Sequence, residues 1–159
     1  MCIRDRLNRS DYGTKEVVVG WVTANHAFSN TINGTSSYRA IAMTDVYLKQ
    51  YRQKEIKQNP QLARQLLSEL SYRLVQSERM IAIISLKRIE DRLRELLILL
   101  KAEMGHPVNN GVRLTARFTH QNLADAICTT RVTITRIFGD LQNQNLIEFD
   151  RDRHLIIKF

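Results

Sequence analysis

The stretch HQNLADAICTTRVTITRIFGDLQ, residues 120–142, decides the fold of this chain. Within it, CTTRVTITR at 128–136 crowds threonines and arginines around Val132 and Ile134. β-Branched residues lose side-chain freedom in a helix and are enriched in strands, so propensity alone favours a strand here. The spacing of small and apolar residues over the whole stretch favours two helices instead.

That spacing is the helix-turn-helix layout, with a small residue fifth from His120, a turn residue ninth, and apolar residues fifteenth and eighteenth. Ala124, the fifth residue, allows two helices to cross closely. The hydroxyls of Thr119 and Thr130 are expected to cap the two helices. The wedge between the helices is expected to hold four apolar side chains: Leu123, Ile127, Ile134 and Ile137. The alternative is a buried helical hairpin with arginines at its surface.

Burial in that wedge is expected to override the strand propensity of the second helix. Its opposite face then carries Arg131, Thr133 and Arg136 outward. The planar fork of arginine matches the two acceptors of guanine in the major groove, and threonine contacts a phosphate or a thymine methyl group. The pattern therefore predicts a helix that reads double-stranded DNA.

Cys128 occupies the ninth position, where the turn needs a positive φ that a side chain disfavours. We expect a cost of roughly 1 kcal/mol and interpret the cysteine as a tolerated variant of the usual glycine. The alternative is a reactive thiol, but no His or Asp stands at a spacing that assembles a triad. Cys2 is the only other cysteine, so neither a disulfide framework nor a metal site is indicated.

The composition fits a nucleic-acid partner. The 159 residues include 24 basic and 16 acidic side chains, a formal charge of +8, which suits a polyanion such as DNA. A soluble protein with a basic surface is the alternative. The longest apolar run, at 96–100, is far shorter than the ~20 residues of a membrane span. We therefore expect an intracellular protein without a membrane partner, and the lack of a phosphate loop or paired acid and base predicts that it is not an enzyme.

The first part of the chain favours strands, in KEVVVGWV (15–22), SYRAIAM (37–43) and DVYLKQY (45–51), with a Gly, Ser and Asn loop at 28–37. These strands are too few to close a barrel or a sandwich. Either the following helix covers the small sheet, or the chain is a fragment of a larger parent.

A long helix is expected from Asn59-Pro60 to about residue 86, since proline suits a first helical turn. Its residues Leu67, Leu70, Leu74, Ser77, Ile81 and Ile84 are spaced 3, 4, 3, 4, 3, as in a coiled-coil seam. The spacing favours a parallel homodimer. The alternative is an amphipathic helix that packs on its own sheet.

The C-terminal part begins with a second helix at about 87–104, which Gly105 should end. GHPVNNG at 105–111 reads as a loop, and VRLTARF at 112–118 as a strand. QNLIEFDRDRHLIIKF at 144–159 then predicts two short strands around a charged turn, which is a wing. Three basic side chains there either touch phosphates or belong to a solvated hairpin: Arg151, Arg153 and Lys158.

These segments together resemble the CRP/FNR superfamily of transcription regulators, and within it the NtcA-type global nitrogen regulators of cyanobacteria and red-algal chloroplasts. The resemblance is carried by 73–93, 96–114 and 120–142, above all by TRVTITR at 130–136. It implies an α+β chain with a partial β-roll at 1–58, a dimerisation helix at 59–86 and a winged helix-turn-helix at 87–159. MCIRDR, at the start, matches nothing in that family, and the β-roll looks truncated at its N-terminal side.

The same resemblance assigns functional residues. Base reading falls to Arg131, Val132, Thr133 and Arg136, and phosphate contact to Thr119, Gln121 and Thr130. It implies a homodimer that works with RNA polymerase in a bacterial cytoplasm or a chloroplast stroma, reads a palindrome and controls nitrogen-assimilation genes. No cofactor is required. 2-Oxoglutarate is an effector of the family, and Phe28, Arg73 and Glu78 match residues of its site, in which Arg73 and Glu78 come from different subunits; another family arginine is replaced near Ser36. The alternative for Arg73 and Glu78 is an ordinary i, i+5 pair on a solvated helix face. The competing hypothesis is a dimeric module that binds the transcription machinery without reading DNA.

Overall fold

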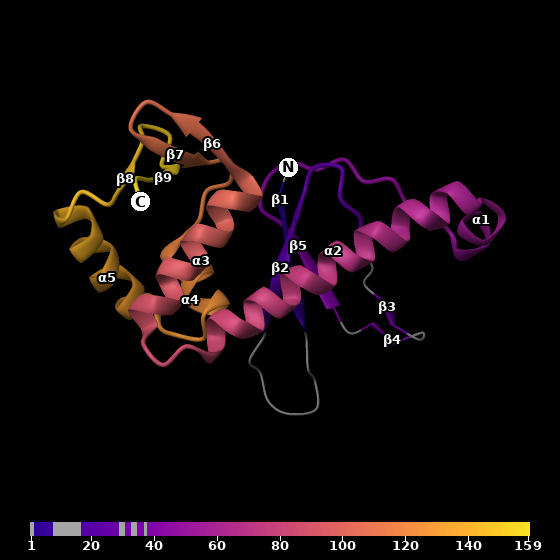
Figure 1. Cartoon of the computed structure of the whole chain (residues 1–159), viewed down its shortest axis with the longest axis horizontal. Helices are drawn as coiled ribbons and strands as arrows, with labels where there is room; N and C mark the ends of the chain where they lie inside the picture. The colour runs from indigo at the N-terminus through magenta and orange to yellow at the C-terminus, as the bar shows by residue number, and fades with distance from the viewer. Residues whose placement is uncertain (1, 8–16, 29–30, 33–34, 37) are drawn as a thin grey trace.

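The computed structural model describes residues 2–7, 17–28, 31–32, 35–36 and 38–159. The chain runs from a small antiparallel sheet along one long helix to a second unit of helices and a second sheet (Figure 1). This is the α+β arrangement that the sequence predicts.

The first sheet has the strand order β2-β1-β5, formed by β1 (Cys2–Leu7), β2 (Val17–Thr23) and β5 (Tyr38–Ala42). Both neighbours of β1 run antiparallel to it. β2 and β5 confirm two of the predicted strands. The central strand is β1, which is not among the predicted strands.

Two other expectations for this part are corrected. The predicted strand at 45–51 is wrong, because the chain there is irregular and pairs with none of the described strands. The side chains of Tyr47 and Leu48 are 94% and 62% exposed. The predicted loop at 28–37 contains a short hairpin of β3 (Thr31–Ile32) and β4 (Thr35–Ser36).

α1 (Gln53–Gln58) leads into α2 (Pro60–Ser85), the long helix that crosses the molecule in Figure 1. The side chain of Asn59 accepts a hydrogen bond from the Leu62 amide at 3.1 Å, and Pro60 follows it in the first turn. The predicted helix start is therefore confirmed. After extended residues at 86 and 88, α3 (Ile89–Met104) turns back toward the sheet.

The second unit surrounds α3. Its remaining elements are β6 (Gly105–Val108), β7 (Gly111–Leu114), α4 (His120–Ala126), α5 (Arg131–Asn143), β8 (Ile147–Phe149) and β9 (Leu155–Ile157). The four strands form one antiparallel sheet in the order β6-β7-β9-β8.

The loop expected at 105–111 is also wrong in part, because Gly105–Val108 pairs with β7 and only 109–110 make the turn. Pro107 lacks a backbone N–H donor, but it is tolerated because β6 is an edge strand. On the open side of an edge strand there is no neighbouring strand to accept a hydrogen bond. The wing hairpin β8–β9 is confirmed, as part of this larger sheet.

A continuous core joins the two units. On α3, Leu93, Leu96, Leu97 and Leu100 are fully buried in a core cluster that also contains residues of α4 and α5. The same core includes Trp21 of β2, whose ring meets Phe118 edge to face at 6.1 Å between centroids. The segment that leads into α4 is thereby packed directly against the first sheet.

Candidate nucleic-acid interface

α4 and α5 form the predicted helix-turn-helix. The Thr119 hydroxyl accepts from the Asn122 amide at 3.0 Å, and the Asn122 side chain accepts from the Thr119 amide at 3.0 Å. The Thr130 hydroxyl likewise accepts from the Thr133 amide at 3.2 Å. Both predicted caps are confirmed, and each fixes where its helix begins.

The turn between the helices is closed at Cys128, which has a φ of 58°. The next amide, of Thr129, donates to the Ala124 carbonyl at 2.9 Å. Cys128 is exposed and free, so the prediction of a strained turn residue is confirmed. Strain at a single non-glycine residue in this region costs roughly 1 kcal/mol, which the wedge below it outweighs.

The wedge is filled as predicted. Ala124 is fully buried at the helix crossing. The four apolar side chains expected beside it are buried as well: Leu123, Ile127, Ile134 and Ile137. Phe138, which the sequence argument did not single out, is buried with them. Burial of one face of α5 therefore decides for a helix over the strand that its residues prefer.

The opposite face of α5 carries the predicted base-reading residues. Arg131 is exposed, and Val132 is 78% exposed, which is unusual for an apolar side chain in a helix with so well buried a face. Thr133 is half-buried, and its hydroxyl lies 2.9 Å from that of Thr130. The four residues lie in the first two turns of the helix, next to its capped N-terminus.

Arg136 is exposed too, but it already has partners within the protein. Its guanidinium donates to Glu90 at 3.0 Å and lies 3.5 Å from Asp140. A backbone hydrogen bond at Glu90 and the bond from Arg136 lower the pKa of the Glu90 carboxyl, so it stays ionised at neutral pH. The sequence does not reveal this pair, because Glu90 is 46 residues away and lies on α3.

Of the predicted phosphate contacts, Thr119, Gln121 and Thr130 all lie at the surface. Gln121 donates its side-chain amide to Asp125 at 2.6 Å. Each of the two threonines uses its hydroxyl to cap its own helix. Their role toward DNA therefore stays a prediction, and the capping role is the one that the structure assigns.

His120 is a further residue that the sequence argument missed. Its Nδ1 lies 2.8 Å from the Thr135 hydroxyl, whose proton is donated to the Arg131 carbonyl, so Nδ1 is the donor of this pair. The ring packs against Phe138 at 4.9 Å between centroids. Burial, and secondarily the charge of Arg131, lower the pKa of His120. A neutral histidine thus connects the start of α4 to the first turns of α5.

Arg92 holds this unit to the bend between α2 and α3. Its Nε donates to the Leu86 carbonyl at 2.7 Å, and an Nη donates to the Ile127 carbonyl at 3.3 Å. Ile127 caps the C-terminal end of α4, where a cation also complements the helix dipole. One side chain therefore spans the bend and the turn of the helix-turn-helix.

The three basic side chains of the wing differ in their contacts. Lys158 contacts Glu148 at 2.6 Å and Asn145 at 2.7 Å, so it belongs to the hairpin. Arg151 and Arg153 are exposed at the tip. Arg151 and Arg153 therefore remain the candidates in the wing for contact with DNA phosphates.

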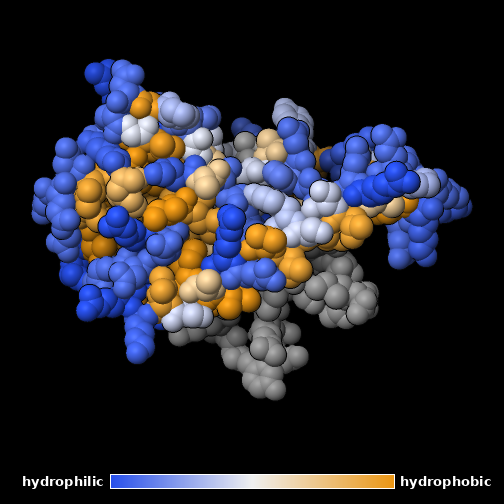
Figure 2. All heavy atoms as spheres, viewed as in Figure 1, coloured by the Kyte–Doolittle hydropathy of each residue, from blue (hydrophilic) through white to orange (hydrophobic). Residues whose placement is uncertain are grey.

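α2 has two distinct faces. Gln76, Met80 and Ile83 are buried toward the first sheet and the second unit. Four residues of the predicted seam lie at the surface with exposures between 58% and 65%: Leu67, Leu70, Leu74 and Ile81. Apolar side chains gather along α2 in the view of Figure 2. The helix therefore packs on its own sheet and still leaves the seam uncovered in this chain.

The predicted effector residues are Phe28, Arg73 and Glu78, of which Arg73 and Glu78 are expected to act from different subunits. Arg73 donates to the Trp21 carbonyl at 3.0 Å and to Oε1 of Gln76 at 2.6 Å, which turns it toward its own sheet. Glu78 is exposed and Phe28 half-buried. The side chain at Ser36 lies outside the described residues. A role for these residues toward 2-oxoglutarate stays a prediction.

None of the described helices combines the length and the apolar character that a membrane crossing requires. Among the described residues, no three His, Cys, Asp or Glu side chains come together as a metal-binding group.

Comparison with known proteins identifies this architecture. Residues 91–158 match the Crp-like helix-turn-helix domain. The chain is 32% identical to a global nitrogen regulator of Synechococcus elongatus over 93% of its own length and 71% of that protein, and 31% identical to one of Synechocystis sp. over 93% and 70%. The solved structure of a CRP-family transcriptional regulator from Thermus thermophilus shares the fold, with a TM-score of 0.80, 17% identity, and coverage of 99% of this chain and 79% of that one.

The matched proteins are regulators: global nitrogen regulators and a CRP-family transcriptional regulator. The chain belongs to the CRP/FNR family of transcription regulators and is related to the global nitrogen regulators of cyanobacteria.

Proposed function

We propose that this protein is a homodimeric, sequence-specific DNA-binding regulator that reads a palindromic site and controls nitrogen-related genes. The observation that carries the proposal is the outer face of α5, where Arg131, Val132, Thr133 and Arg136 stand at or near the surface of a helix anchored by a buried opposite face. A helix in the major groove needs this combination of a fixed base and polar, outward-facing residues.

The exposed seam of α2 supports the dimer. Four large apolar side chains in a 3-4 repeat favour burial against a second copy of the same helix. A twofold axis along that seam would present two α5 helices to one face of a duplex, and such dimers read half-sites about one helical turn, ~34 Å, apart.

Arg131 and Arg136 would make different contributions. Arg131 stands in the first turn of α5 and, by its place at the exposed helix start, is the better candidate for a bidentate contact with guanine. Arg136 must first leave Glu90, so its contact with DNA replaces an existing ion pair and gains less net free energy.

The test is fluorescence anisotropy of a labelled duplex carrying the palindrome of NtcA-like regulators, GTA and TAC separated by eight bases, beside a scrambled duplex. We expect tight binding to the palindrome alone and an affinity that falls steeply with salt. Arg131→Ala should cost about 1 to 3 kcal/mol and relax the preference for the palindrome. Arg64→Ala, an exposed position on α2 away from α5, is the matched control.

Equal binding to both duplexes would mean that Arg131 and Arg136 contact only phosphates and do not read the base sequence. Absence of binding to either duplex would favour a module that contacts RNA polymerase or another regulator without reading DNA. Adding 2-oxoglutarate to the same assay tests the effector prediction. An increase in affinity that Arg73→Gln abolishes would support a working effector site.

A further inference from the structure

A second polar site lies on the side of α2 that faces the C-terminal end of α3. Gln76 is the only buried polar or charged residue among those that the structure describes, with 2% of its surface exposed. Its Oε1 accepts from the Trp21 amide at 3.2 Å and from Arg73 at 2.6 Å. Its Nε2, which carries two N–H donors, has no hydrogen-bond partner among the described residues.

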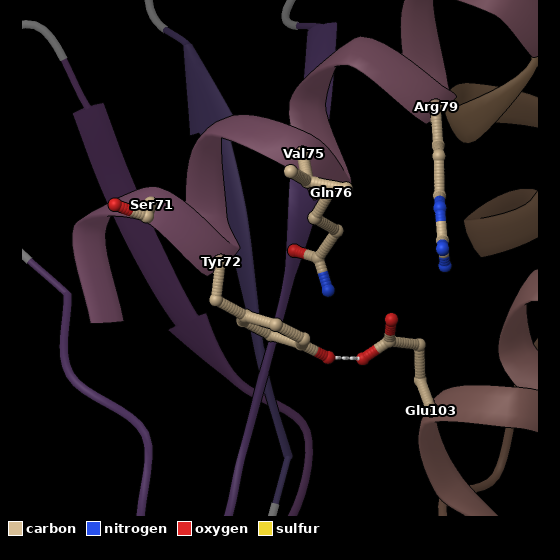
Figure 3. Close-up of a pocket in the computed structure, with 6 residues that line it drawn as sticks. All are labelled: Ser71, Tyr72, Val75, Gln76, Arg79 and Glu103. Atoms are coloured by element: carbon tan, nitrogen blue, oxygen red, sulfur yellow. Dashed lines mark hydrogen bonds between the residues drawn. The ribbon is translucent and has the colours of Figure 1, made fainter. Parts of the chain in front are cut away.

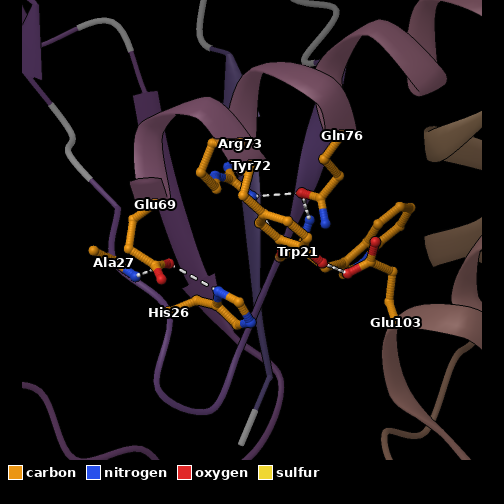
Figure 4. A network of polar contacts seen from close by, with 8 residues as sticks. All are labelled: Trp21, His26, Ala27, Glu69, Tyr72, Arg73, Gln76 and Glu103. Carbon is orange, nitrogen blue, oxygen red and sulfur yellow. Dashed lines mark hydrogen bonds and ion pairs between the residues drawn. The ribbon is translucent and has the colours of Figure 1, made fainter. Parts of the chain in front are cut away.

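The orientation of this amide is fixed by its neighbours. Exchanging the oxygen and nitrogen of Gln76 would point N–H donors at the Trp21 amide and at the Arg73 guanidinium, which are donors themselves. Figure 4 shows both contacts on the oxygen side. Buried donors without a partner are rare in folded proteins, so these N–H groups are available to an acceptor from outside the chain, either water or a ligand.

The free N–H groups face a cavity. It has a volume of about 240 Å³ and is lined by Ser71, Tyr72, Val75, Gln76, Arg79 and Glu103. In Figure 3 the amide nitrogen of Gln76 points into the space between Tyr72, Arg79 and Glu103. At roughly 30 Å³ per water molecule, this space suits a compound of about the size of a small amino acid.

The cavity has a cation and an anion on separate walls. Arg79 belongs to α2 and Glu103 to α3, and no ion pair joins them in the described part of the chain. The Tyr72 hydroxyl donates to Glu103, and its ring is stacked on His26 at 4.7 Å from the other side. Burial, together with Glu103, raises the pKa of Tyr72 to about 12, so the phenol keeps its proton and orients the carboxylate.

We propose that this cavity binds a free α-amino acid with a small apolar side chain. The carboxylate of the ligand would accept from Nε2 of Gln76 and from Arg79, and its ammonium group would donate to Glu103. Val75 and the ring of Tyr72 offer an apolar wall for the side chain. A bound ligand would connect α2 to α3, the helix on which the DNA-binding unit is built.

The probes are L-valine and two analogues that each lack one charge: 2-hydroxy-3-methylbutanoate, without the ammonium group, and isobutylamine, without the carboxylate. The readout is the side-chain amide ¹⁵N–¹H signal of Gln76 in the full-length protein, assigned by its loss in Gln76→Met. We expect L-valine to shift this signal in a saturable titration, and both analogues to bind at least tenfold more weakly.

Two substitutions test the walls without touching the buried amide. Arg79→Gln and Glu103→Gln should each weaken L-valine by tenfold or more, and the glutamine at 103 still accepts from Tyr72. Exposed positions on the same helices, Arg64→Gln and Glu95→Gln, should leave the titration unchanged. Circular dichroism checks that each variant is folded.

The proposal is overturned if L-valine leaves the Gln76 signal in place up to about ten millimolar, a weak limit for a specific site. Equal shifts by all three probes would overturn it as well, because the cavity would then select for shape and not for the two charges. The measurement does not involve DNA, so its outcome is independent of the proposed regulator function.

Discussion

Arg136 on the outer face of α5 donates a hydrogen bond to Glu90 at the start of α3, across 3.0 Å. The pair connects a predicted base-reading residue to the helix that follows the bend after α2. In the free protein the arginine is therefore directed toward the protein, and DNA has to compete with a carboxylate for it.

Replacing that carboxylate should strengthen DNA binding. Glu90→Gln removes a negative charge near the duplex and frees Arg136, so we expect affinity for the palindrome to rise about two- to fivefold, in line with the modest worth of an exposed ion pair. Anisotropy at low salt measures it. Glu95→Gln, an exposed residue on the same helix, should have a smaller effect. Weaker binding by Glu90→Gln would mean that the pair holds Arg136 in its reading position.

The seam of α2 is testable through oligomeric state. Leu74 is 61% exposed in the single chain, so Leu74→Glu should leave the protomer folded. In a dimer it would place two carboxylates in an apolar seam, and we expect dissociation to become at least about tenfold easier. Light scattering after size exclusion gives the mass directly, and Gln65→Glu is the exposed control. A Leu74→Glu dimer as tight as the wild type would exclude this seam.

Glycine in the turn of the helix-turn-helix should make the protein more stable. At Cys128 the φ of 58° suits glycine, so Cys128→Gly should raise the free energy of unfolding by up to about 1 kcal/mol, after allowing for the greater freedom of glycine in the unfolded chain. Urea denaturation measures the gain. Cys128→Ala keeps the Cβ atom and should bring none, and a gain for alanine equal to that for glycine would show that the thiol and not the backbone is unfavourable.

His120 should make stability depend on pH. Its pKa is lowered in the folded protein, so the unfolded chain takes up the proton first as the pH falls. Stability should be constant above the ordinary histidine pKa of about 6.5 and decline below it, until the folded form is protonated as well. Urea midpoints at pH 7.5 and 5.5 should differ more for the wild type than for His120→Gln. His106→Gln, at an exposed site, should behave like the wild type.

The parts of the fold that the sequence predicts well are those whose reasons are local. The caps at Asn59, Thr119 and Thr130 follow from one side chain and the amides next to it. The positive φ at Cys128 follows from its place in a fixed spacing. In such cases the sequence neighbours are also the physical neighbours.

The sequence-based predictions fail where the local structure depends on contacts with distant segments of the chain. GHPV at 105–108 contains two strong turn residues and is a strand because β7 pairs with it. DVYLKQY at 45–51 alternates like a strand but pairs with no strand in the part of the chain that the structure describes. Glu90 with Arg136, and Gln76 with Trp21, are separated by 46 and 55 residues, and only the placement of the helices brings each pair together.

The edge-to-face contact of Trp21 with Phe118 has a practical consequence. The sequence contains a single tryptophan, and it stands with 1% of its surface exposed where the first sheet meets the approach to α4. The intrinsic emission of the protein therefore comes from one ring at the junction of its two units. Any rearrangement that separates the sheet from the helix-turn-helix would expose the Trp21 ring to water and shift its fluorescence emission to longer wavelength. The intrinsic fluorescence of the protein therefore reports whether its two units are in contact.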